Sequence, residues 1–314
     1  MGSRELAIVV VAAVGVASLA SGSAVAGTGA VAASPGTHVW GTAMKVPGTA
    51  TLNRGGNANV TSVSCASPGN CGAGGIYRDG TRHFQAFVVS QVSGTWHTAI
   101  EVPGTAALNQ GGDASITSVS CASAGNCSAG GFYGDGFGRQ AFVVGQTHGT
   151  WHAAIEVPGT AALNQGLAAE INSVSCASAG NCSAGGFYAS SAAGQAFVVS
   201  QVSGTWGTAI EVPGTAALNQ GGNDDITSVS CASAGNCSAG GFYLDSSGHH
   251  QAFVVSQVSG TWHPAIEVPG TAALNQGGSA EVSSMSCALA GRCSAGGRYT
   301  NIFGRVQAFV DSET

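Results

Sequence analysis

One segment of about 55 residues occurs five times along this chain. The recurrence is marked by five tryptophans, Trp40, Trp96, Trp151, Trp206 and Trp262, which lie 56, 55, 55 and 56 residues apart. A fixed period of this length indicates one supersecondary unit that is copied and stacked, so that neighbouring copies bury each other's apolar faces. The repeat therefore constrains the fold more strongly than any local pattern does.

The second copy shows what one unit contains. Four short runs, rich in β-branched and apolar residues and separated by turn signals, lie at 116–122, 126–133, 140–146 and 150–157. No helical periodicity of any length appears, and the longest connection is the loop 103–112. Four antiparallel strands in about 55 residues match the size of one β-propeller blade.

The two ends of the repeated region favour a closed ring. The ordered chain is expected to begin with a fourth strand, at 38–40 and Val46, and to end with a third strand at 307–310. The N-terminal strand could then complete the last blade and remove two open sheet edges. We therefore predict an all-β fold, a five-bladed β-propeller of four-stranded blades closed by the N-terminal strand. Separate beads on a string and a linear β-solenoid are the alternatives.

Ten cysteines form five pairs with the same internal spacing. The pairs are Cys65/Cys71, Cys121/Cys127, Cys176/Cys182, Cys231/Cys237 and Cys287/Cys293. Structural zinc sites usually space their cysteines by about two to four residues and need four ligands, and no histidine sits at a fixed offset that would complete such a site. We therefore expect one disulfide per blade, formed in an oxidising compartment. Reduced cysteines that act as small hydrophobic residues are the alternative.

The N-terminus resembles an export signal. Arg4 precedes the apolar run 6–20, and small residues at 24–26 offer a cleavage site. We predict a signal peptide at 1–26, a flexible linker at 27–37, the propeller at 38–314, and a secreted, extracellular protein. An uncleaved signal that is retained as an anchor is the alternative.

The charge of the chain restricts its partners. Charged residues make up only 8% of the sequence, the formal net charge is -6, and no basic run is present. Nucleic acids and anionic membranes are bound through clusters of Lys and Arg, so neither is favoured as a partner. We expect a monomer whose mature chain has no membrane span.

One end of the predicted blades gathers side chains that suit a neutral sugar. Each second strand ends in a tyrosine, and each long loop carries an asparagine. The tyrosines are Tyr77, Tyr133, Tyr188, Tyr243 and Tyr299, and the asparagines are Asn53, Asn109, Asn164, Asn219 and Asn275. Aromatic faces can stack on the C–H groups of a sugar, and amides can bond its hydroxyls. The alternative is structural: tyrosines that cap the blade core and asparagines that hold tight turns.

The position just before each first strand breaks the symmetry of the copies. Glu170, Asp225 and Glu281 occupy it in the last three. In a closed propeller these carboxylates would surround the channel mouth, where they could bind a hard cation such as Ca²⁺ or form the separated acid pair of an inverting glycosidase. Near-identical blades argue against catalysis, because an acid and a base need different environments. Solvated residues at the strand entry are the alternative, and we predict no other cofactor.

The repeated phrases carry a resemblance to known proteins. The segment Ser-Val-Ser-Cys-Ala-Ser-Ala-Gly-Asn-Cys-Ser-Ala-Gly-Gly-Phe-Tyr at 118–133 and the recurring Gly-Thr-Trp resemble the tandem Cys-repeat secreted proteins of actinobacteria, a group without a characterised function. The resemblance covers 38–311 and implies export and a propeller-like fold, but no catalytic residues. The expected architecture is similar to that of the five-bladed tachylectin-type lectins, which is an analogy of fold alone.

These observations favour a secreted, non-catalytic binding module with several equivalent sites, for glycans or a cell-surface polymer. Copied sites give avidity for a repetitive surface without strong single contacts. A glycosidase or lyase that uses the channel-mouth carboxylates is the second hypothesis. A structural surface protein without a ligand is the third.

Overall fold

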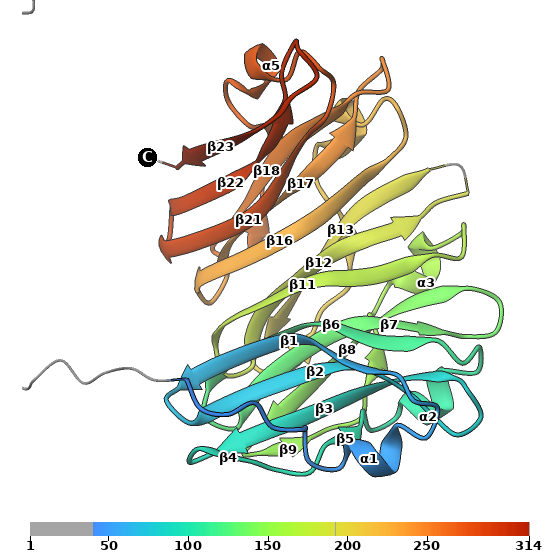
Figure 1. The fold of residues 1–314 in the computed structure, drawn as a ribbon. Coiled ribbons are helices and arrows are strands. Elements are labelled where there is room, and N and C mark those ends of the chain that lie inside the picture. The colour runs from blue at the N-terminus through green and yellow to red at the C-terminus, as the bar shows by residue number, and fades with distance from the viewer. Residues whose placement is uncertain (1–39, 192, 314) are drawn as a thin grey trace, which may run out of the picture. The chain divides into compact units, whose positions relative to one another are not determined.

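The computed structural model describes residues 40–191 and 193–313. The predicted signal peptide at 1–26 and linker at 27–37 lie outside these residues, and so does the start of the predicted N-terminal strand. Within the described part, every copy of the repeat folds into one small antiparallel sheet, which we call a blade (Figure 1).

The strands of the five blades follow the sequence repeat. Blade 1 comprises β1 (Ala58–Ser67), β2 (Asn70–Arg78), β3 (Phe84–Val92), β4 (Thr95–Trp96) and β5 (Ile100–Glu101). Blade 2 comprises β6 (Ala114–Ser123), β7 (Asn126–Gly134), β8 (Arg139–Thr147), β9 (Thr150–Trp151) and β10 (Ile155–Glu156). Blade 3 comprises β11 (Ala169–Ser178), β12 (Asn181–Ala189), β13 (Gly194–Val202), β14 (Thr205–Trp206) and β15 (Ile210–Glu211). Blade 4 comprises β16 (Asp224–Ser233), β17 (Asn236–Leu244), β18 (His250–Val258), β19 (Thr261–Trp262) and β20 (Ile266–Glu267). Blade 5 comprises β21 (Ala280–Leu289), β22 (Arg292–Thr300) and β23 (Val306–Ser312).

The predicted all-β fold of propeller-type blades is confirmed. The first three strands of each blade form two consecutive antiparallel hairpins. The fourth strand of blades 1–4 is split into two short pieces, and both pieces pair with the third strand, as β4 and β5 do with β3. In blade 5, β21, β22 and β23 form a sheet of three strands in the described residues.

The long loop of each unit contains one helical turn, which the sequence patterns did not predict. The five turns are α1 (Thr49–Leu52), α2 (Thr105–Leu108), α3 (Thr160–Leu163), α4 (Thr215–Leu218) and α5 (Thr271–Leu274). Each begins after a glycine in the left-handed region, such as Gly104 at φ 86°. Glycine is suited to this position because it has no Cβ to clash there.

The hydrophobic core is shared between consecutive blades. Neighbouring first strands lie side by side, and the core clusters at the four blade junctions combine residues of two blades. The side chain of Ile116 on β6 packs against Gly74 on β2, where an added Cβ would lie 2.7 Å from Ile116 Cγ2. Trp151 is 8% exposed and belongs to the cluster between blades 1 and 2, so it covers this blade interface.

A line of serine hydroxyls also joins the blades. Ser62 Oγ accepts from the backbone N–H of Val119 (2.9 Å), and Ser64 Oγ accepts from that of Cys121 (3.0 Å). The same pair of bonds recurs at the next three blade junctions. The repeated Ser-Val-Ser-Cys phrase is therefore an inter-blade connection as well as a strand.

The predicted disulfides are present. One bond lies in each blade and joins the first strand to the second across their shared turn. The bonds are Cys65–Cys71, Cys121–Cys127, Cys176–Cys182, Cys231–Cys237 and Cys287–Cys293. Among the residues described, no helix is long and apolar enough to cross a membrane.

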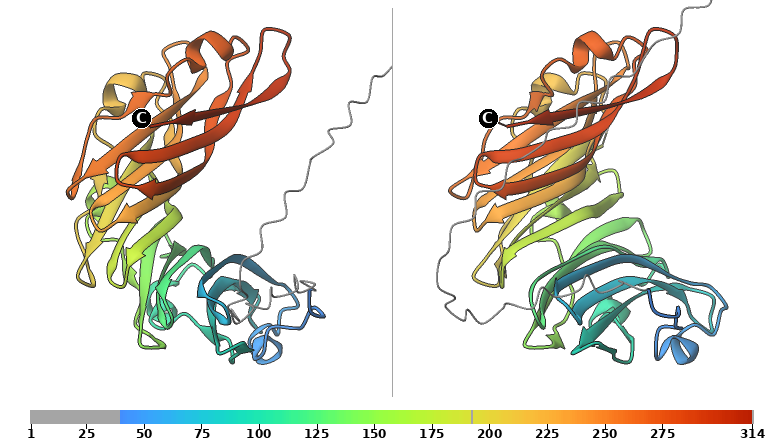
Figure 2. Two further views of the ribbon diagram at one scale, coloured as in Figure 1. Left: turned by 90° about the vertical axis from the view of Figure 1, so that its left-hand side faces the viewer. Right: turned by 60° about the vertical axis from the view of Figure 1, so that its left-hand side comes forward.

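The strand pairing that was predicted to close the ring is not found among the described residues. Residues 40–46 form no strand, and β23 pairs only with β22 in the described part of the chain. Val46 packs instead on the core of blade 1, where the carbonyl of Pro47 accepts from the N–H of Ala99 (2.8 Å). The carbonyls of Pro103, Pro158 and Pro213 accept the same bond from the following blade, so the first Val-Pro segment belongs to blade 1. In Figure 2, the blue β1 and the red β23 lie at opposite ends of the array.

Candidate functional site

The tyrosines do not form the expected sugar-stacking face. Tyr77, Tyr133, Tyr188 and Tyr243 are only 2–4% exposed, and Tyr299 is half-buried. The hydroxyl of Tyr133 donates to Glu156 Oε2 (3.1 Å), and the same bond joins each buried tyrosine to the glutamate of its own fourth strand. Burial, together with the adjacent carboxylate, raises the pKa of Tyr133 well above its ordinary value. These tyrosines cap the blade core, which is their structural role.

The predicted asparagines are also part of the framework. Asn109, Asn164, Asn219 and Asn275 are buried, and Asn53 is half-buried. Asn109 Nδ2 donates to the carbonyl of Phe84 (3.0 Å) and to Gln85 Oε1 (2.8 Å), while its Oδ1 accepts from the N–H of Asp113 (2.9 Å). The structure does bring the tyrosine ends and asparagine loops together, because Gly134 N also donates to Asn109 Oδ1 (3.3 Å). The tyrosines and the asparagine loops therefore lie at the same end of the blades, as predicted, but the asparagine amides bond to the protein itself.

Two of the three predicted carboxylates are neutralised by arginine. Glu170 Oε2 lies 2.9 Å from Arg139 Nη1, and the same guanidinium lies 3.3 Å from Asp113 Oδ2 and over the ring of Phe132. Burial raises the pKa of Glu170, although the charge of Arg139 opposes the shift. On the last blade, Arg298 Nε lies 3.1 Å from Glu281 Oε1. Ion-paired carboxylates of this kind are not a free acid and base pair.

The third carboxylate is held by an amide. Asp225 Oδ1 accepts from Asn172 Nδ2 (2.8 Å), and burial raises its pKa well above the usual range, with the charge of Glu170 acting in the same direction. No group of three or more His, Cys, Asp or Glu side chains that could hold a metal ion is found among the described residues. The hypothesis of a calcium site formed by Glu170, Asp225 and Glu281 is therefore not supported.

A different site emerges where consecutive blades meet, on the side of the third strands. At the junction of blades 1 and 2, Ser90 Oγ on β3 accepts from two donors of blade 2: Gln146 Nε2 (2.8 Å) and Trp151 Nε1 (3.2 Å). The junction of blades 3 and 4 repeats this arrangement with Ser200, Gln257 and Trp262, at 2.9 and 3.3 Å. One serine hydroxyl thus satisfies the glutamine and tryptophan of the next blade.

The junction of blades 2 and 3 lacks this hydroxyl, because the equivalent residue on β8 is Gly145. A Cβ added at Gly145 would meet no atom within 4 Å, so the space of the missing side chain is empty of protein. Trp206 is 8% exposed, and its Nε1 is buried without a hydrogen-bond partner among residues 40–191 and 193–313. Gln201 Nε2 retains its bond to the carbonyl of Gly204 (3.1 Å) but has no serine acceptor. A buried donor without an acceptor is costly, about 1–3 kcal/mol.

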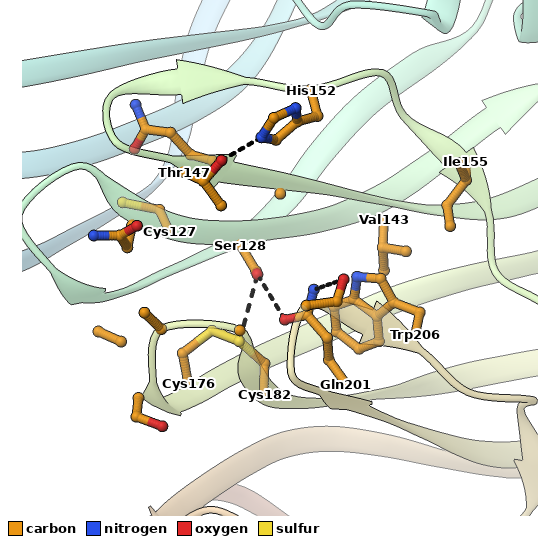
Figure 3. Close-up of a pocket in the computed structure, with 18 of the residues that line it drawn as sticks. Cys127, Ser128, Val143, Thr147, His152, Ile155, Cys176, Cys182, Gln201 and Trp206 are labelled. Atoms are coloured by element: carbon orange, nitrogen blue, oxygen red, sulfur yellow. Dashed lines mark hydrogen bonds between the residues drawn. A yellow bond between two sulfur atoms is a disulfide. The ribbon is translucent and has the colours of Figure 1, made fainter.

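The vacant position opens into a cavity of about 180 Å³ (Figure 3). At its floor, Ser128 Oγ donates to Gln201 Oε1 (3.4 Å) and lies 3.4 Å from Cys182 Sγ. Val143 and Ile155 form apolar walls, and the hydrogen-bonded pair Thr147 and His152 lies at the rim. None of the described residues that line the cavity is Asp, Glu, Lys or Arg. The arrangement suits a neutral group that accepts hydrogen bonds.

The sequence contains one signal for this site, a difference between copy 2 and the other copies. Copies 1, 3 and 4 have Ser-Gln-Val-Ser at 90–93, 200–203 and 256–259, whereas copy 2 has Gly-Gln-Thr-His at 145–148. Comparing the copies position by position shows that three of these four residues differ in copy 2. The chemical meaning of the change depends on Trp206, which lies about one repeat further along the chain and meets Gly145 only in the folded array.

Comparisons with known proteins do not assign a family. No family model matches the chain, and no curated protein matches it. Solved structures with a similar course include a protein named as a glycoside hydrolase from Parabacteroides distasonis (8% identity, 81% of this chain, 86% of that chain, TM-score 0.39). A second is a protein of unknown function from Dyadobacter fermentans (12% identity, 83% of this chain, 81% of that chain, TM-score 0.41). A third is an α-L-arabinofuranosidase from Podospora anserina in complex with cellotriose (9% identity, 82% of this chain, 91% of that chain, TM-score 0.35). Likenesses this distant carry no conclusion about function.

Proposed function

We propose that this protein is a secreted, non-catalytic binding protein that holds a hydroxyl group of a carbohydrate in the cavity between blades 2 and 3. The observation that carries the proposal is the buried, unpartnered N–H of Trp206 in a cavity that Gly145 also lines. The counterparts Trp151 and Trp262 donate to a serine at the position that Gly145 holds. Five disulfides support export, because such bonds persist in oxidising compartments.

The neighbouring junctions define the chemistry of the missing group. At the other junctions, Ser90 and Ser200 each place one hydroxyl on a carbon within reach of an indole N–H and a glutamine amide. A sugar hydroxyl is the same functional group and can accept both bonds while donating its own proton. The ligand would thus complete a hydrogen-bond network that the protein already contains in two other places.

The rest of the cavity favours a neutral, partly apolar ligand. Val143 and Ile155 offer surfaces for C–H groups, and Thr147 and His152 can bond further hydroxyls at the rim. A charged ligand would find no ionic partner there. Because Gly145 occurs at one of the four blade junctions, the proposal is one principal site per chain rather than the several equivalent sites expected from the repeat.

A glycan-binding experiment with two matched variants tests the proposal. Calorimetric titration with glucose, galactose, mannose, N-acetylglucosamine and their oligosaccharides should show binding of at least one sugar class with one site per chain. Gly145→Ser restores the hydroxyl and should weaken binding at least tenfold, while the melting temperature rises because Trp206 gains its acceptor. Ser200→Gly copies the cavity to the junction of blades 3 and 4 and should add a second site.

The variants distinguish loss of the site from loss of the fold. Gly145→Ser is expected to be more stable than the natural protein, so weaker binding cannot be attributed to unfolding. Absence of binding to every sugar, or equal binding by the natural protein and Gly145→Ser, would show that the cavity is not the ligand site. Glucuronic acid serves as a charged control that should not bind.

A further inference from the structure

The two ends of the blade array expose faces that are buried everywhere else in it. On blade 1, Val60 and Val63 are 37% and 57% exposed, whereas their counterparts on blade 2, Ile116 and Val119, are 0% and 6% exposed. At the other end, Val310 on β23 is 87% exposed, whereas the same position is fully buried in blades 1, 2 and 3. Each end therefore presents one half of a blade–blade interface.

The apolar parts of the two halves are complementary in shape. At each internal junction, a β-branched side chain of one blade packs on a bare glycine of the preceding blade, as Ile171 does on Gly130 with a separation of 2.6 Å from the added Cβ. Val60 is the branched residue of blade 1, and Gly296 is the bare glycine of blade 5. A Cβ added at Gly296 would meet no atom closer than 3.9 Å, so this receptor position is open.

The polar parts are complementary too. Ser284 and Ser286 on β21 are exposed, at the positions whose hydroxyls accept N–H groups of the next blade elsewhere. On blade 1, the matching backbone donors are the N–H groups of Val63 and Cys65. Their counterparts in blades 2–5 donate to the serines of the preceding blade. Acceptors thus lie at one end of the array, and the matching donors lie at the other.

An apolar groove marks the face of blade 1. It has a volume of about 200 Å³ and is lined by Val60, Val63, Ala73, Val89 and Trp96, together with Met44 and the Val-Pro segment that follows it. At two internal junctions, the indole N–H of a tryptophan donates to a serine on the third strand of the preceding blade. If blade 5 of a second copy precedes blade 1, Ser312 holds this serine position opposite Trp96. Ser312 is exposed.

We propose that the exposed face of blade 5 docks on the exposed face of blade 1 of a second copy of this chain. The contact continues the blade–blade packing that already occurs at four junctions within one chain. It is heterologous, because two different surfaces meet, so association proceeds head to tail and ends either in a closed ring or in an open filament. The proposal does not depend on the sugar site and replaces the monomer expected from the sequence.

Sedimentation velocity of the purified full chain tests the proposal. The natural protein should show species heavier than the monomer, whose share increases across a concentration series. Val63→Arg blocks the face of blade 1, and Val310→Arg blocks the face of blade 5, so each variant alone should sediment as a monomer. Val202→Arg, at an exposed valine of blade 3 that lies on neither face, is the matched control and should associate like the natural protein.

A mixing experiment separates a head-to-tail contact from general stickiness. Val63→Arg keeps a working blade 5 face, and Val310→Arg keeps a working blade 1 face, so an equimolar mixture should form a dimer of twice the monomer mass and nothing larger. The proposal is overturned if the natural protein sediments as a monomer throughout, as it would if its own N-terminal residues covered the face of blade 1. It is also overturned if the mixture contains only monomers.

Discussion

Asp224 differs chemically from its counterparts in the other copies. Those counterparts are Ala58, Ala114, Ala169 and Ala280. Its carboxylate is 0% exposed: Oδ1 accepts from the N–H of Ala196 (2.8 Å) and from Asn219 Nδ2 (3.0 Å), and Oδ2 has no partner in the described part of the structure. Burial raises the pKa of Asp224 to about 6 from an ordinary value of 3.8. The folded protein therefore holds this proton to higher pH than the unfolded chain does.

Asp224→Ala is predicted to stabilise the protein in a pH-dependent way. Between about pH 4 and pH 6 the folded state binds more protons than the unfolded state, so the contribution of Asp224 to stability falls as the pH rises. The free energy of unfolding of the variant minus that of the natural protein should therefore increase by up to about 3 kcal/mol from pH 4 to pH 7. Urea denaturation at the two pH values measures this difference. A constant difference between the two proteins would show that the Asp224 carboxyl is not perturbed.

The buried tyrosines lead to a second prediction. Tyr133→Phe removes the hydroxyl that donates to Glu156 but keeps the ring in the core. The free energy of unfolding should fall by about 1–2 kcal/mol, because a partly buried carboxylate loses its donor. The affinity for the sugar should not change, since Tyr133 is 3% exposed and does not line the cavity. A large loss of affinity with unchanged stability would restore the tyrosine hypothesis derived from the sequence.

For single residues, the position along a strand was easier to predict than the burial of the side chain. The sequence places a tyrosine at the end of each second strand, and the structure keeps it there. It could not show that the glutamate of the fourth strand lies against that ring, because the contact joins Tyr133 to Glu156 across two turns. The asparagines were misjudged for the same reason: the acceptors of Asn109 Nδ2 belong to blade 1, and the donors to its Oδ1 belong to blade 2.

The second strands show how closely one blade approaches the next. Gly130→Ala should destabilise the protein by about 1–3 kcal/mol, because the new Cβ would lie 2.6 Å from Ile171 Cγ2 and the neighbouring strand must move. Gly296→Ala, at the same position of blade 5, is the matched control and should have little effect at concentrations where the protein is monomeric, since its Cβ has space within one chain. Thermal melts of both variants test the contact. Equal losses would mean that the cost arises within the strand and not at the interface.

The disulfide hairpins allow a similar comparison between the edge and the interior. Loop entropy gives about 2 kcal/mol for a bond that closes such a short loop. Replacing both cysteines of Cys176–Cys182 by alanine should cost more than replacing those of Cys65–Cys71, because the internal bond also packs against the preceding blade while Cys65 is exposed. Chemical denaturation of the two double variants measures the difference. A larger loss at Cys65–Cys71 would contradict the proposed packing role.

Strands and hairpins were predictable because each depends on a few adjacent residues. The alternation of apolar side chains and the glycine-containing turns identified the first three strands of every copy. The four-residue helices were missed, since one turn is too short to show a period of 3.6 residues. The split of each fourth strand was missed as well, because only short pieces such as Thr150–Trp151 pair with β8.

For the whole molecule, the number of units was predictable, whereas the predicted closing strand is not found among the described residues. Counting strands identified five blades and suggested that the N-terminal strand completes the last one. Whether blades form a ring depends on the rotation between consecutive blades, which is set by contacts such as Ile116 on Gly74 and leaves no trace in sequence spacing. The Val-Pro segment at 46–47 then joins blade 1, and both ends of the array stay exposed.

The proposed sugar binding depends on the cavity between blades 2 and 3. The most direct test is the NMR resonance of the Trp206 indole N–H, assigned by its loss in Trp206→Phe and followed while the sugar selected by calorimetry is added. We predict a downfield proton shift that saturates with the same dissociation constant as calorimetry, because the N–H gains a hydroxyl acceptor. In Gly145→Ser the resonance should start near the shifted position and stay there. A Trp206 resonance that does not move at saturating sugar would contradict the account.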